Sequence, residues 1–382
     1  MDTETFEQLL ATIERYVGDR LIPAEREVSD TDAIPADIVA EMRDMGLFGL
    51  TIPEEFGGIG LNVEEEMRVV MALCRASPAF RSLIGTNNGI GSLGIVLAGT
   101  NAQKVYWLPR LASGETIASF ALTEPEAGSD AAAVRTKAEK VDGGWVLNGG
   151  KRYITNAGIA GVFTVFARTE QDGGSGVTAF LVPAGVEGLR VSGSEAKMGQ
   201  QGAHIHEVYF DDCRIPDDAL LGEPGKGFAV AMRILARGRL HIAAVCCGLA
   251  ERALEEALGY AMERKQFGEV IANFQLVQAL LADSRAESLA GRELVLATAR
   301  RRDAGQDVDM EASCAKMFCS EMVGRVTDRA VQVLGGAGYL KAFPVERLYR
   351  DARILRIYEG TTQIQQLVIA KAMLRRARAG SK

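Results

Sequence analysis

Residues 353–366 read RILRIYEGTTQIQQ, and this stretch decides how the carboxy-terminal part of the chain folds. It can form two short apolar helical segments, one before Glu359 and one after it, because apolar residues that can be buried lie on both sides: Leu355, Ile357, Ile364 and Leu367. Gly360 gives the backbone freedom to break, and Thr361 or Thr362 offers a hydroxyl that can cap a new helix. The pattern predicts a helix that stops at Glu359 and starts again.

Such a break takes Glu359 off the helical face. A carboxylate between Tyr358 and Gly360 could lose its water and still reach a ligand, which is the environment that raises a glutamate pKa toward that of a general base. A solvated acid that caps the following helix is the simpler interpretation of these residues alone. The rest of the chain has to decide between the two.

The composition is that of an ordinary globular protein. The chain has 382 residues, 47% of them hydrophobic and 24% charged, and this length suggests two or three domains. No apolar run approaches the roughly 20 residues that span a bilayer. The formal charge of −7 gives no reason to expect nucleic acid as the main partner.

The compartment is expected to be reducing. The first ten residues, MDTETFEQLL, are acidic and lack the basic start of a secretory signal, so the cytoplasm is the expected location. The six cysteines form no paired metal spacing, and most lie in apolar helical patterns. We expect them to be small buried hydrophobic residues.

Hydrophobic periodicity divides the chain into three parts. Residues 1–115 are mainly helical, with apolar faces at 3–17 and 63–76 and a further helix after Asp32. Residues 116–225 change to strand patterns, with a hairpin around Asp142-Gly143-Gly144 and further β-rich runs. The expected runs are 136–141, 145–147, 162–167, 177–182, 189–191 and 208–210.

The third part, residues 226–382, is helical again. Its expected helices are 227–264, 274–303, 308–334, 345–357 and 361–378, and short glycine-containing links separate them. Long helices with short links make a four-helix bundle. The predicted class is therefore α+β and mainly α: an amino-terminal helical domain, a central antiparallel β domain and a carboxy-terminal bundle.

Several other chemistries find no support in the sequence. The chain has three histidines; His204 and His206 would share one face of a strand, but no third metal ligand is visible, so imidazoles that are solvated or contact a loop are expected. Gly89, Gly91 and Gly94 have the spacing of a dinucleotide fingerprint without its preceding strand, and close helix packing explains them better. There is no Gly-x-Ser-x-Gly elbow for a hydrolase.

Two stretches of the β domain could receive a cofactor. Residues 120–130, FALTEPEAGSD, leave backbone donors in a turn beside the hydroxyls of Thr123 and Ser129, where a flat polar heterocycle or a pyrophosphate could bind. A plain β-turn is the alternative. Residues 148–158, NGGKRYITNAG, place Tyr153 where its ring could stack on a cofactor.

Five segments in this order resemble the acyl-CoA dehydrogenases. They are FALTEPEAGSD (120–130), KRYITNAG (151–158), ERKQFG with FQLVQ after it (263–278), VQVLGGAGY (331–339) and RDARILRIYEGTTQIQQ (350–366). PEEFGGIG and GTNAQKVYWLPRLASGE extend the likeness over nearly the whole chain. The resemblance implies the same three domains, FAD as cofactor, and a homotetramer or homodimer.

The resemblance also implies the residues of the flavin site. Those expected to face the flavin from one subunit are Phe120, Leu122, Thr123, Gly128, Ser129, Tyr153, Ile154 and Thr155. Those expected to reach the FAD of a neighbouring subunit are Arg264, Phe267, Phe274, Gln275, Gln332, Val333, Leu334, Gly335 and Gly336. Thr361 and Gln363 are expected to complete a flavin contact. Tyr153 stands where many members have tryptophan, and a smaller ring still stacks.

By the same resemblance, Glu359 is the base that removes the α-proton of an acyl-CoA thioester. Its backbone N–H would polarise the thioester oxygen together with a flavin ribityl hydroxyl. Some branched-chain members carry the base on another helix, at a position where this chain has Gly238. The residues expected at the substrate are Ser129, Gly238, Arg239, Tyr358 and Gly360.

The implied reaction is FAD-dependent α,β-dehydrogenation of an acyl-CoA to a trans-2-enoyl-CoA, as in fatty acid metabolism, with electrons passed to an electron-transfer flavoprotein. An acyl-CoA oxidase or flavin monooxygenase on the same fold remains an alternative, as does a non-catalytic flavin-binding member. The acyl chain is left open, because a methylene is worth only about 1 to 3 kcal/mol in such a pocket.

Overall fold

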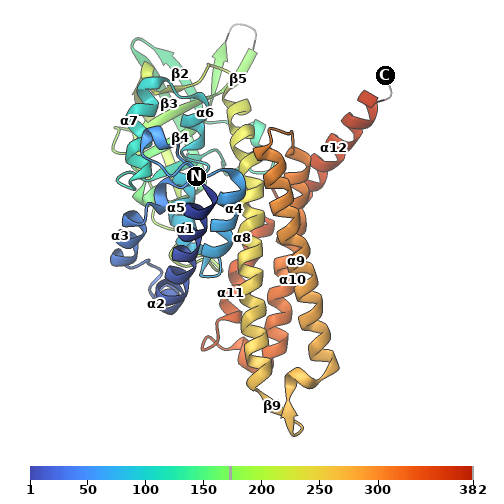
Figure 1. Ribbon diagram of the computed structural model, residues 1–382. Helices are drawn as coiled ribbons and strands as arrows, with labels where there is room; N and C mark the ends of the chain where they lie inside the picture. Colours follow the sequence, from blue (N-terminus) through green and yellow to red (C-terminus); the bar gives the residue numbers. More distant parts are fainter. Residues whose placement is uncertain (172–173, 381–382) are drawn as a thin grey trace.

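The computed structural model describes residues 1–171 and 174–380. A helical amino-terminal part, a sheet and a set of long carboxy-terminal helices follow one another along the chain, as the sequence predicts (Figure 1). The first part contains α1 (Thr3–Tyr16), α2 (Ile22–Thr31), α3 (Ala36–Asp44), α4 (Val63–Leu73), α5 (Pro78–Asn88), α6 (Leu93–Ala98) and α7 (Asn101–Ala112).

Helix α2 was not resolved as a separate element by the sequence pattern. A π-helical turn, Val17–Leu21, joins it directly to α1, and one of its buried residues is Glu25 rather than an apolar side chain. Charged Glu25 interrupts the apolar period, because its carboxylate is buried against Arg252 and Arg347 of the bundle. Because a buried, ion-paired glutamate occupies an inward position, the apolar repeat that would predict this helix is absent from the sequence.

The central part is a mixed sheet. Its strands are β1 (Ala118–Ala121), β2 (Lys137–Val141), β3 (Gly144–Thr155), β4 (Val162–Gln171), β5 (Gly174–Pro183), β6 (Leu189–Val191), β7 (Ile205–Pro216) and β8 (Leu220–Leu221). They follow the order β6-β7-β3-β2-β4-β5-β8, with β1 beside β4. The hairpin of β2 and β3 is confirmed, with Asp142-Gly143 at its turn.

The expectation of a wholly antiparallel domain needs correction, since β4 pairs in parallel with both β1 and β2. The chain reverses at the turn after β2 and again after β3, so β4 runs in the direction of β2. Gly91 and Gly94, which were expected to serve close packing, approach Ala118 of β1 and Ile234 of the bundle. These contacts fasten the first helical part to the sheet.

The carboxy-terminal part contains α8 (Gly227–Glu263), α9 (Gln275–Asp303), α10 (Asp309–Leu334), α11 (Val345–Ala352) and α12 (Thr362–Gly380). The first four form the bundle, while α12 projects away from it (Figure 1). A small hairpin of β9 (Lys265–Gln266) and β10 (Glu269–Val270) closes its lower end. None of the described helices is both long and apolar enough to cross a membrane.

The predicted burial around the helix break is only half right. Leu355 is fully buried, but Ile357 is 47% exposed and Leu367 is 55% exposed. The predicted helix over 345–357 also ends earlier, because α11 stops at Ala352 and a 3₁₀ turn over Arg353–Arg356 follows. Ile357 lies in the break itself, and Leu367 lies on the projecting helix. Neither side chain is therefore covered by the residues around it.

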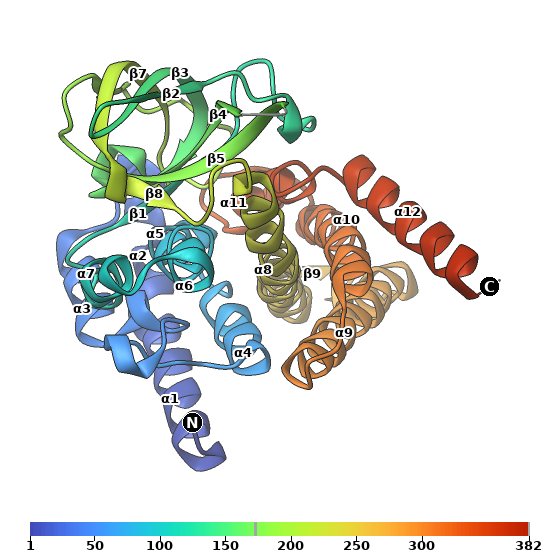
Figure 2. The same ribbon diagram turned by 90° about the horizontal axis from the view of Figure 1, so that it is seen from above.

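Helix α8 is the element on which the two helical parts meet. Viewed from above, α4 of the first part and α10 of the bundle flank it (Figure 2). Met67 and Met71 of α4 share one hydrophobic core with Ala243, Val245 and the rest of the inner face of α8. This packing places the amino-terminal end of α8 between α5, α6 and the helix break.

Candidate active site

The backbone at the helix break holds Glu359 in a strained conformation. Glu359 has a φ of 53° and Gly360 a φ of 93°, and the left-handed region is costly for a residue with a side chain. Lys316 Nζ donates to the Gly360 carbonyl at 2.7 Å, and Gln365 Nε2 donates to the Glu359 carbonyl at 3.1 Å. These bonds from α10 and α12 stabilise the turn.

The carboxylate of Glu359 does not cap the following helix. The N–H of Ile364 donates to the hydroxyl of Thr361 at 3.2 Å, so Thr361 is the residue that caps α12. Thr362 instead donates its hydroxyl to Glu321 of α10 at 2.7 Å. The capping interpretation of Glu359 is therefore wrong, and its side chain is free for another role.

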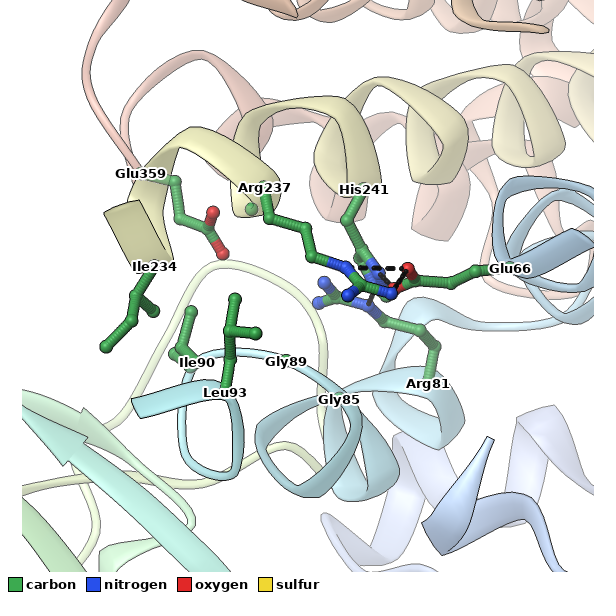
Figure 3. Close-up of a pocket in the computed structure, with 11 residues that line it drawn as sticks. Glu66, Arg81, Gly85, Gly89, Ile90, Leu93, Ile234, Arg237, His241 and Glu359 are labelled. Atoms are coloured by element: carbon green, nitrogen blue, oxygen red, sulfur yellow. Dashed lines mark hydrogen bonds and ion pairs between the residues drawn. The ribbon is translucent and has the colours of Figure 1, made fainter. Parts of the chain in front are cut away.

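Glu359 extends into a small cavity between the helices (Figure 3). The residues around it come from α4, α5, α6, α8 and the turn between α5 and α6. They are Glu66, Arg81, Gly85, Gly89, Ile90, Leu93, Ile234, Arg237, Gly238 and His241. The cavity thus lies between the first helical part and the bundle.

Gly238 of α8 makes room for the carboxylate. A Cβ atom at this position would lie 3.0 Å from Cδ of Glu359 and would overlap its Oε2. That Oε2 atom is buried and accepts no hydrogen bond from the described residues. Burial raises the pKa of Glu359, although the positive charges of Arg81, Lys316 and Arg239 oppose the rise. A dehydrated carboxylate with a raised pKa suits a general base.

A buried polar network forms the wall opposite Glu359. Arg81 Nε donates to His241 Nε2 at 2.6 Å, and His241 Nδ1 lies 2.9 Å from Glu66 Oε1. Because Nε2 accepts from Arg81, the proton of the imidazole belongs on Nδ1, where it is donated to Glu66. Arg237 Nη2 donates to the other oxygen of Glu66 at 2.7 Å. Sequence reasoning missed all four residues.

Burial and charge pairing shift the pKa values of this network in opposite directions. Burial and the neighbouring Arg81 lower the pKa of His241 to about 4, so the imidazole is neutral near pH 7. Burial alone would raise the pKa of Glu66, but Arg237 and His241 hold it at about 2. The one available signal in the sequence was Arg81 itself, a charge inside the otherwise apolar helical run FRSLIG.

Several of the β-domain residues expected at the flavin are exposed on the surface formed by the loop over 120–130 and the neighbouring end of β3. Tyr153 is 54% exposed with a φ of 59°, and Gly128 and Ser129 are exposed. Phe120, Thr123 and Thr155 are partly exposed. The side chains of Leu122 and Ile154 are buried in the core, so these two residues can offer only backbone groups.

A buried lysine makes this surface rigid. Lys151 Nζ donates to the carbonyls of Leu122 and Phe166 at 3.2 and 2.6 Å and to Glu124 Oε1 at 2.7 Å. Glu124 in turn accepts from the backbone N–H of Thr136 at 3.0 Å. An exposed tyrosine ring beside a fixed loop with free polar groups fits a flat ring system with a polar tail, such as FAD.

The residues expected to reach a neighbour's FAD lie elsewhere. Arg264, Phe267, Phe274 and Gln275 surround the β9–β10 hairpin, which is at the opposite end of the bundle from the sheet (Figure 1). Phe267 is 94% exposed, and Gln332, Gly335 and Gly336 at the end of α10 are exposed as well. Val333 and Leu334 have buried side chains. Within one chain this set does not meet the β-domain set.

The expected substrate residues gather around Glu359 with one exception. Gly238 abuts the carboxylate, Gly360 follows it, and Arg239 is close enough to lower its pKa while Nη1 donates to Ser313 at 3.3 Å. The ring of Tyr358 packs on the bundle core. Ser129, the exception, lies on the β-domain loop. Of the flavin residues expected after the base, Thr361 caps α12 and Gln363 is exposed.

The two histidines of the β domain contact loops, as expected. His204 Nε2 lies 2.7 Å from the Asp32 carbonyl, and His206 Nδ1 lies 3.0 Å from the Ser192 carbonyl. Over residues 1–171 and 174–380, no group of three or more His, Cys, Asp or Glu side chains is arranged to hold a metal ion. His204 therefore fastens the loop before β7 to the first helical part.

The chain thus places a sheet between two helical parts, with a buried carboxylate where the helical parts meet. Sequence models of the acyl-CoA dehydrogenase amino-terminal, middle and carboxy-terminal domains match residues 3–115, 119–213 and 225–374. The chain belongs to the acyl-CoA dehydrogenase family. Members of this family are oxidoreductases that bind FAD.

Individual relatives agree with this assignment. A probable acyl-CoA dehydrogenase, fadE25 of Mycobacterium leprae, is 41% identical over 374 residues, which are 97% of this chain and 96% of that protein. The structure of butyryl-CoA dehydrogenase from Megasphaera elsdenii superposes with a TM-score of 0.94 at 35% identity, covering 98% of this chain and 100% of the other. The structure of a glutaryl-CoA dehydrogenase in complex with glutaryl-CoA superposes with a TM-score of 0.91 at 31% identity, covering 98% of this chain and 96% of the other.

Proposed function

We propose that this chain catalyses the FAD-dependent α,β-dehydrogenation of an acyl-CoA thioester to a trans-2-enoyl-CoA. The observation that carries the proposal is the carboxylate of Glu359, which is buried in a cavity, has a raised pKa and has one oxygen without a hydrogen-bond partner among the described residues. A base that must remove a weakly acidic proton α to a carbonyl needs such a site.

In this mechanism Glu359 removes the α-proton of the thioester. Its own backbone N–H, held by the left-handed turn, polarises the thioester oxygen and stabilises the charge that develops there. When bound, FAD would supply the acceptor for the hydride of the β-carbon. Lys316 and Gln365 keep the turn in place through the carbonyls of Gly360 and Glu359. Gly238 leaves the space in which the carboxylate can approach the substrate.

The proposed flavin residues are the β-domain set around Tyr153, with the backbone of Leu122 and Ile154. The second set, around Phe267 and Gly335, lies at the far end of the bundle, so it can serve only the FAD of another copy of the chain (Figure 1). We therefore propose a homodimer or homotetramer with composite flavin sites. The cytoplasm remains the expected location.

An electron-transfer flavoprotein is the proposed acceptor of the electrons, by analogy with the family. The alternative is an oxidase, in which oxygen reoxidises the flavin. The two are separated by adding acyl-CoA to the holoprotein in air: peroxide formed at the rate of substrate loss would favour the oxidase. Dependence of turnover on an added electron-transfer flavoprotein would favour the dehydrogenase.

Replacing the base is the direct test. Glu359→Gln should keep FAD bound, as judged by the flavin absorbance that co-purifies, because the amide has the shape of the acid. Anaerobic bleaching of the flavin by acyl-CoA should slow by about 10²- to 10⁴-fold, which is the typical contribution of a general base.

The matched control is Glu115→Gln, since Glu115 is 69% exposed and belongs to a surface ion pair. It should bleach at the wild-type rate. Undiminished bleaching by Glu359→Gln, with the control also unchanged, would refute the role of Glu359.

A further inference from the structure

We propose that Gln200, in the loop between β6 and β7, is a positioning residue that holds the Tyr358–Glu359 turn in register with the sheet. The inference rests on the proposed function, because it concerns the placement of the proposed base. The loop, KMGQQGAHIH (197–206), belongs to the β domain, whereas the turn belongs to the carboxy-terminal part. One side chain would thus join the part expected to hold the flavin to the part that carries the base.

The tip of this loop has a strained backbone. Gln200 has a φ of 54°, in the left-handed region that is costly for a residue with a Cβ atom, and it is only 6% exposed. The residue before it has no room for a side chain, because a Cβ atom on Gly199 would lie 2.7 Å from the carbonyl carbon of Arg350. Such strain persists only where the surrounding contacts enforce it, and it points to a role for the residue that carries it.

Gln200 binds the last turn of α11 through two groups. Its backbone N–H donates to Oδ1 of Asp351, and its Nε2 donates to the Asp351 carbonyl at 3.2 Å. Arg350 supports the contact from the other side, since its Nη1 donates to the Met198 carbonyl at 2.9 Å. These bonds hold the tip of the loop against the end of α11.

Asp351 depends on this contact. Its side chain is fully buried, and its Oδ2 has no hydrogen-bond partner among the described residues. The neighbouring Arg347 and Arg350 form their ion pairs with glutamates instead. Burial raises the pKa of Asp351 to about 6, although the N–H of Gln200 and the two arginines oppose the rise. The loop therefore supplies a hydrogen bond that this buried carboxylate needs.

The same glutamine reaches the residue before the proposed base. The Tyr358 hydroxyl is buried and forms no hydrogen bond with the described residues. Burial raises the pKa of Tyr358, while Arg81 and the side chain of Gln200 oppose the rise, so the amide lies near the hydroxyl. Gln200 thus approaches the segment 351–358 at both of its ends, and Glu359 follows directly.

The loop itself is firmly held. The N–H of Gly202 donates to Oδ1 of Asp32 at 2.7 Å, and the N–H of Asn156 donates to the His204 carbonyl at 3.0 Å. Asn156 directly follows β3, the strand that carries Tyr153. The loop therefore ties the turn of the base to the strand whose tyrosine is expected to stack on the flavin.

Alignment of these two parts matters for the rate. The proposed base and the β-domain flavin residues belong to different parts of the chain, yet both have to be aligned with the same acyl group. A misplacement of about 1 Å can lower a rate about 10²-fold, even when the substrate still binds. Loss of the Gln200 side chain should therefore affect the chemical step more than binding.

Gln200→Gly removes the amide and keeps the turn, because glycine tolerates this φ and still has the N–H that binds Asp351. The probe is anaerobic bleaching of the FAD-loaded protein by butyryl-CoA. The limiting rate at saturation should fall about 10- to 100-fold. The butyryl-CoA concentration that gives half this rate, and the FAD content, should stay within about twofold of the wild type, since their contacts are kept.

The matched control is Gln8→Ala, which removes an exposed amide on α1 and should change none of these values. A wild-type limiting rate in Gln200→Gly would overturn the proposal. Loss of FAD together with a raised half-saturating concentration would overturn it as well, because Gln200 would then only support folding.

Hydrogen exchange tests the position of the turn without the reaction. In FAD-loaded Gln200→Gly, the backbone amides of residues 353–361 should exchange about tenfold faster than in the wild type, while those of α10 should not change, since the loosening is local. If no acyl-CoA bleached even the wild type, the proposed function would fail, and exchange would decide about Gln200 alone. Faster exchange confined to 353–361 supports the positioning role; equal exchange refutes it.

Discussion

Glu359 is subject to two opposing electrostatic effects. Burial disfavours its charged form, while Arg81, Lys316 and Arg239 favour it, and the balance leaves its pKa above the usual value. The same three cations come from α5, α10 and α8, so the base is tuned by elements that are far apart in the sequence. The reactivity of this one carboxylate therefore depends on how the helical parts pack.

The raised pKa of Glu359 predicts a shifted acid limb in the pH–rate profile. Because the base acts only when deprotonated, kcat/KM should fall about tenfold per pH unit below this pKa, and the midpoint should lie above the value of about 4.3 for a free glutamate. The profile of kcat/KM for an acyl-CoA, measured with the flavin-loaded enzyme, gives the midpoint. A limb at or below the free-glutamate value would contradict the assignment.

At the residue scale the sequence pointed to Glu359, the proposed base, but not to its surroundings. Glu359 could be predicted because the signals for a helix break, Gly360 and Thr361, are its immediate neighbours. The network around Arg81 could not, since His241 is 160 positions from Arg81 and 175 from Glu66. Residues that meet only after folding leave no local pattern.

The loop of β-domain residues that would face the flavin depends on a single buried ion pair. Lys151 is 1% exposed, and it donates hydrogen bonds to Leu122, Glu124 and Phe166. These bonds hold Leu122 and Glu124 in place. The loop is therefore fixed from beneath by the strand that carries Tyr153. Strand β3, through Lys151, thus positions the loop over 120–130 that is proposed to bind the flavin.

Lys151→Met should lower the free energy of unfolding by about 3 to 5 kcal/mol, because Glu124 would be left as a buried charge without its cation. Chemical denaturation followed by circular dichroism measures this. Lys137→Met, an exposed lysine on the neighbouring strand, should change stability by no more than about 0.5 kcal/mol. A loss at position 151 as small as at 137 would mean that the pair is dispensable.

At the element scale, long helices and hairpins were predictable and exceptions had physical causes. The ends of α8, α9 and α10 agree with the predicted helices to within a residue, because their apolar faces repeat over many turns. The parallel pairings of β4 were not predictable, since strand order is a tertiary property. Helix α2 was hidden by the ion pairs of Glu25.

At the scale of the whole molecule, large apolar side chains remain exposed at the lower end of the bundle. Phe267, Leu276 and Tyr339 are 94%, 84% and 84% exposed. Such a group of exposed apolar residues is typical of a surface that another chain covers. Phe267 is one of the residues that the family resemblance assigns to the FAD of a neighbour, and Leu276 directly follows another, Gln275.

Phe267→Ala should therefore weaken association of the chains by about 30-fold or more, near 2 kcal/mol, and should lower the FAD content per chain. Light scattering coupled to size exclusion gives the mass, and absorbance gives the flavin. Tyr106→Ala, an aromatic residue that is 52% exposed on α7, serves as the control and should alter neither. An unchanged mass and flavin content for Phe267→Ala would argue against the composite site.

The three-part division could be predicted because each part has its own hydrophobic period. What the sequence could not give is the junction, where α4, α5 and α8 enclose the cavity, because no local signal records which surfaces meet. The family accounts for the proposed chemistry, and the packing of the parts brings together the residues that surround Glu359.

The contact between Gly238 and Glu359 also limits how this protein can evolve. Any side chain at position 238 takes the volume now filled by the carboxylate of Glu359, so a first substitution there displaces the proposed base before it can offer anything new. A lineage that moved its base onto α8 would have to shorten residue 359 first and pass through a form without a base. The effect of a substitution at position 238 therefore depends on the residue at position 359, and only one order of the two mutations avoids a steric clash.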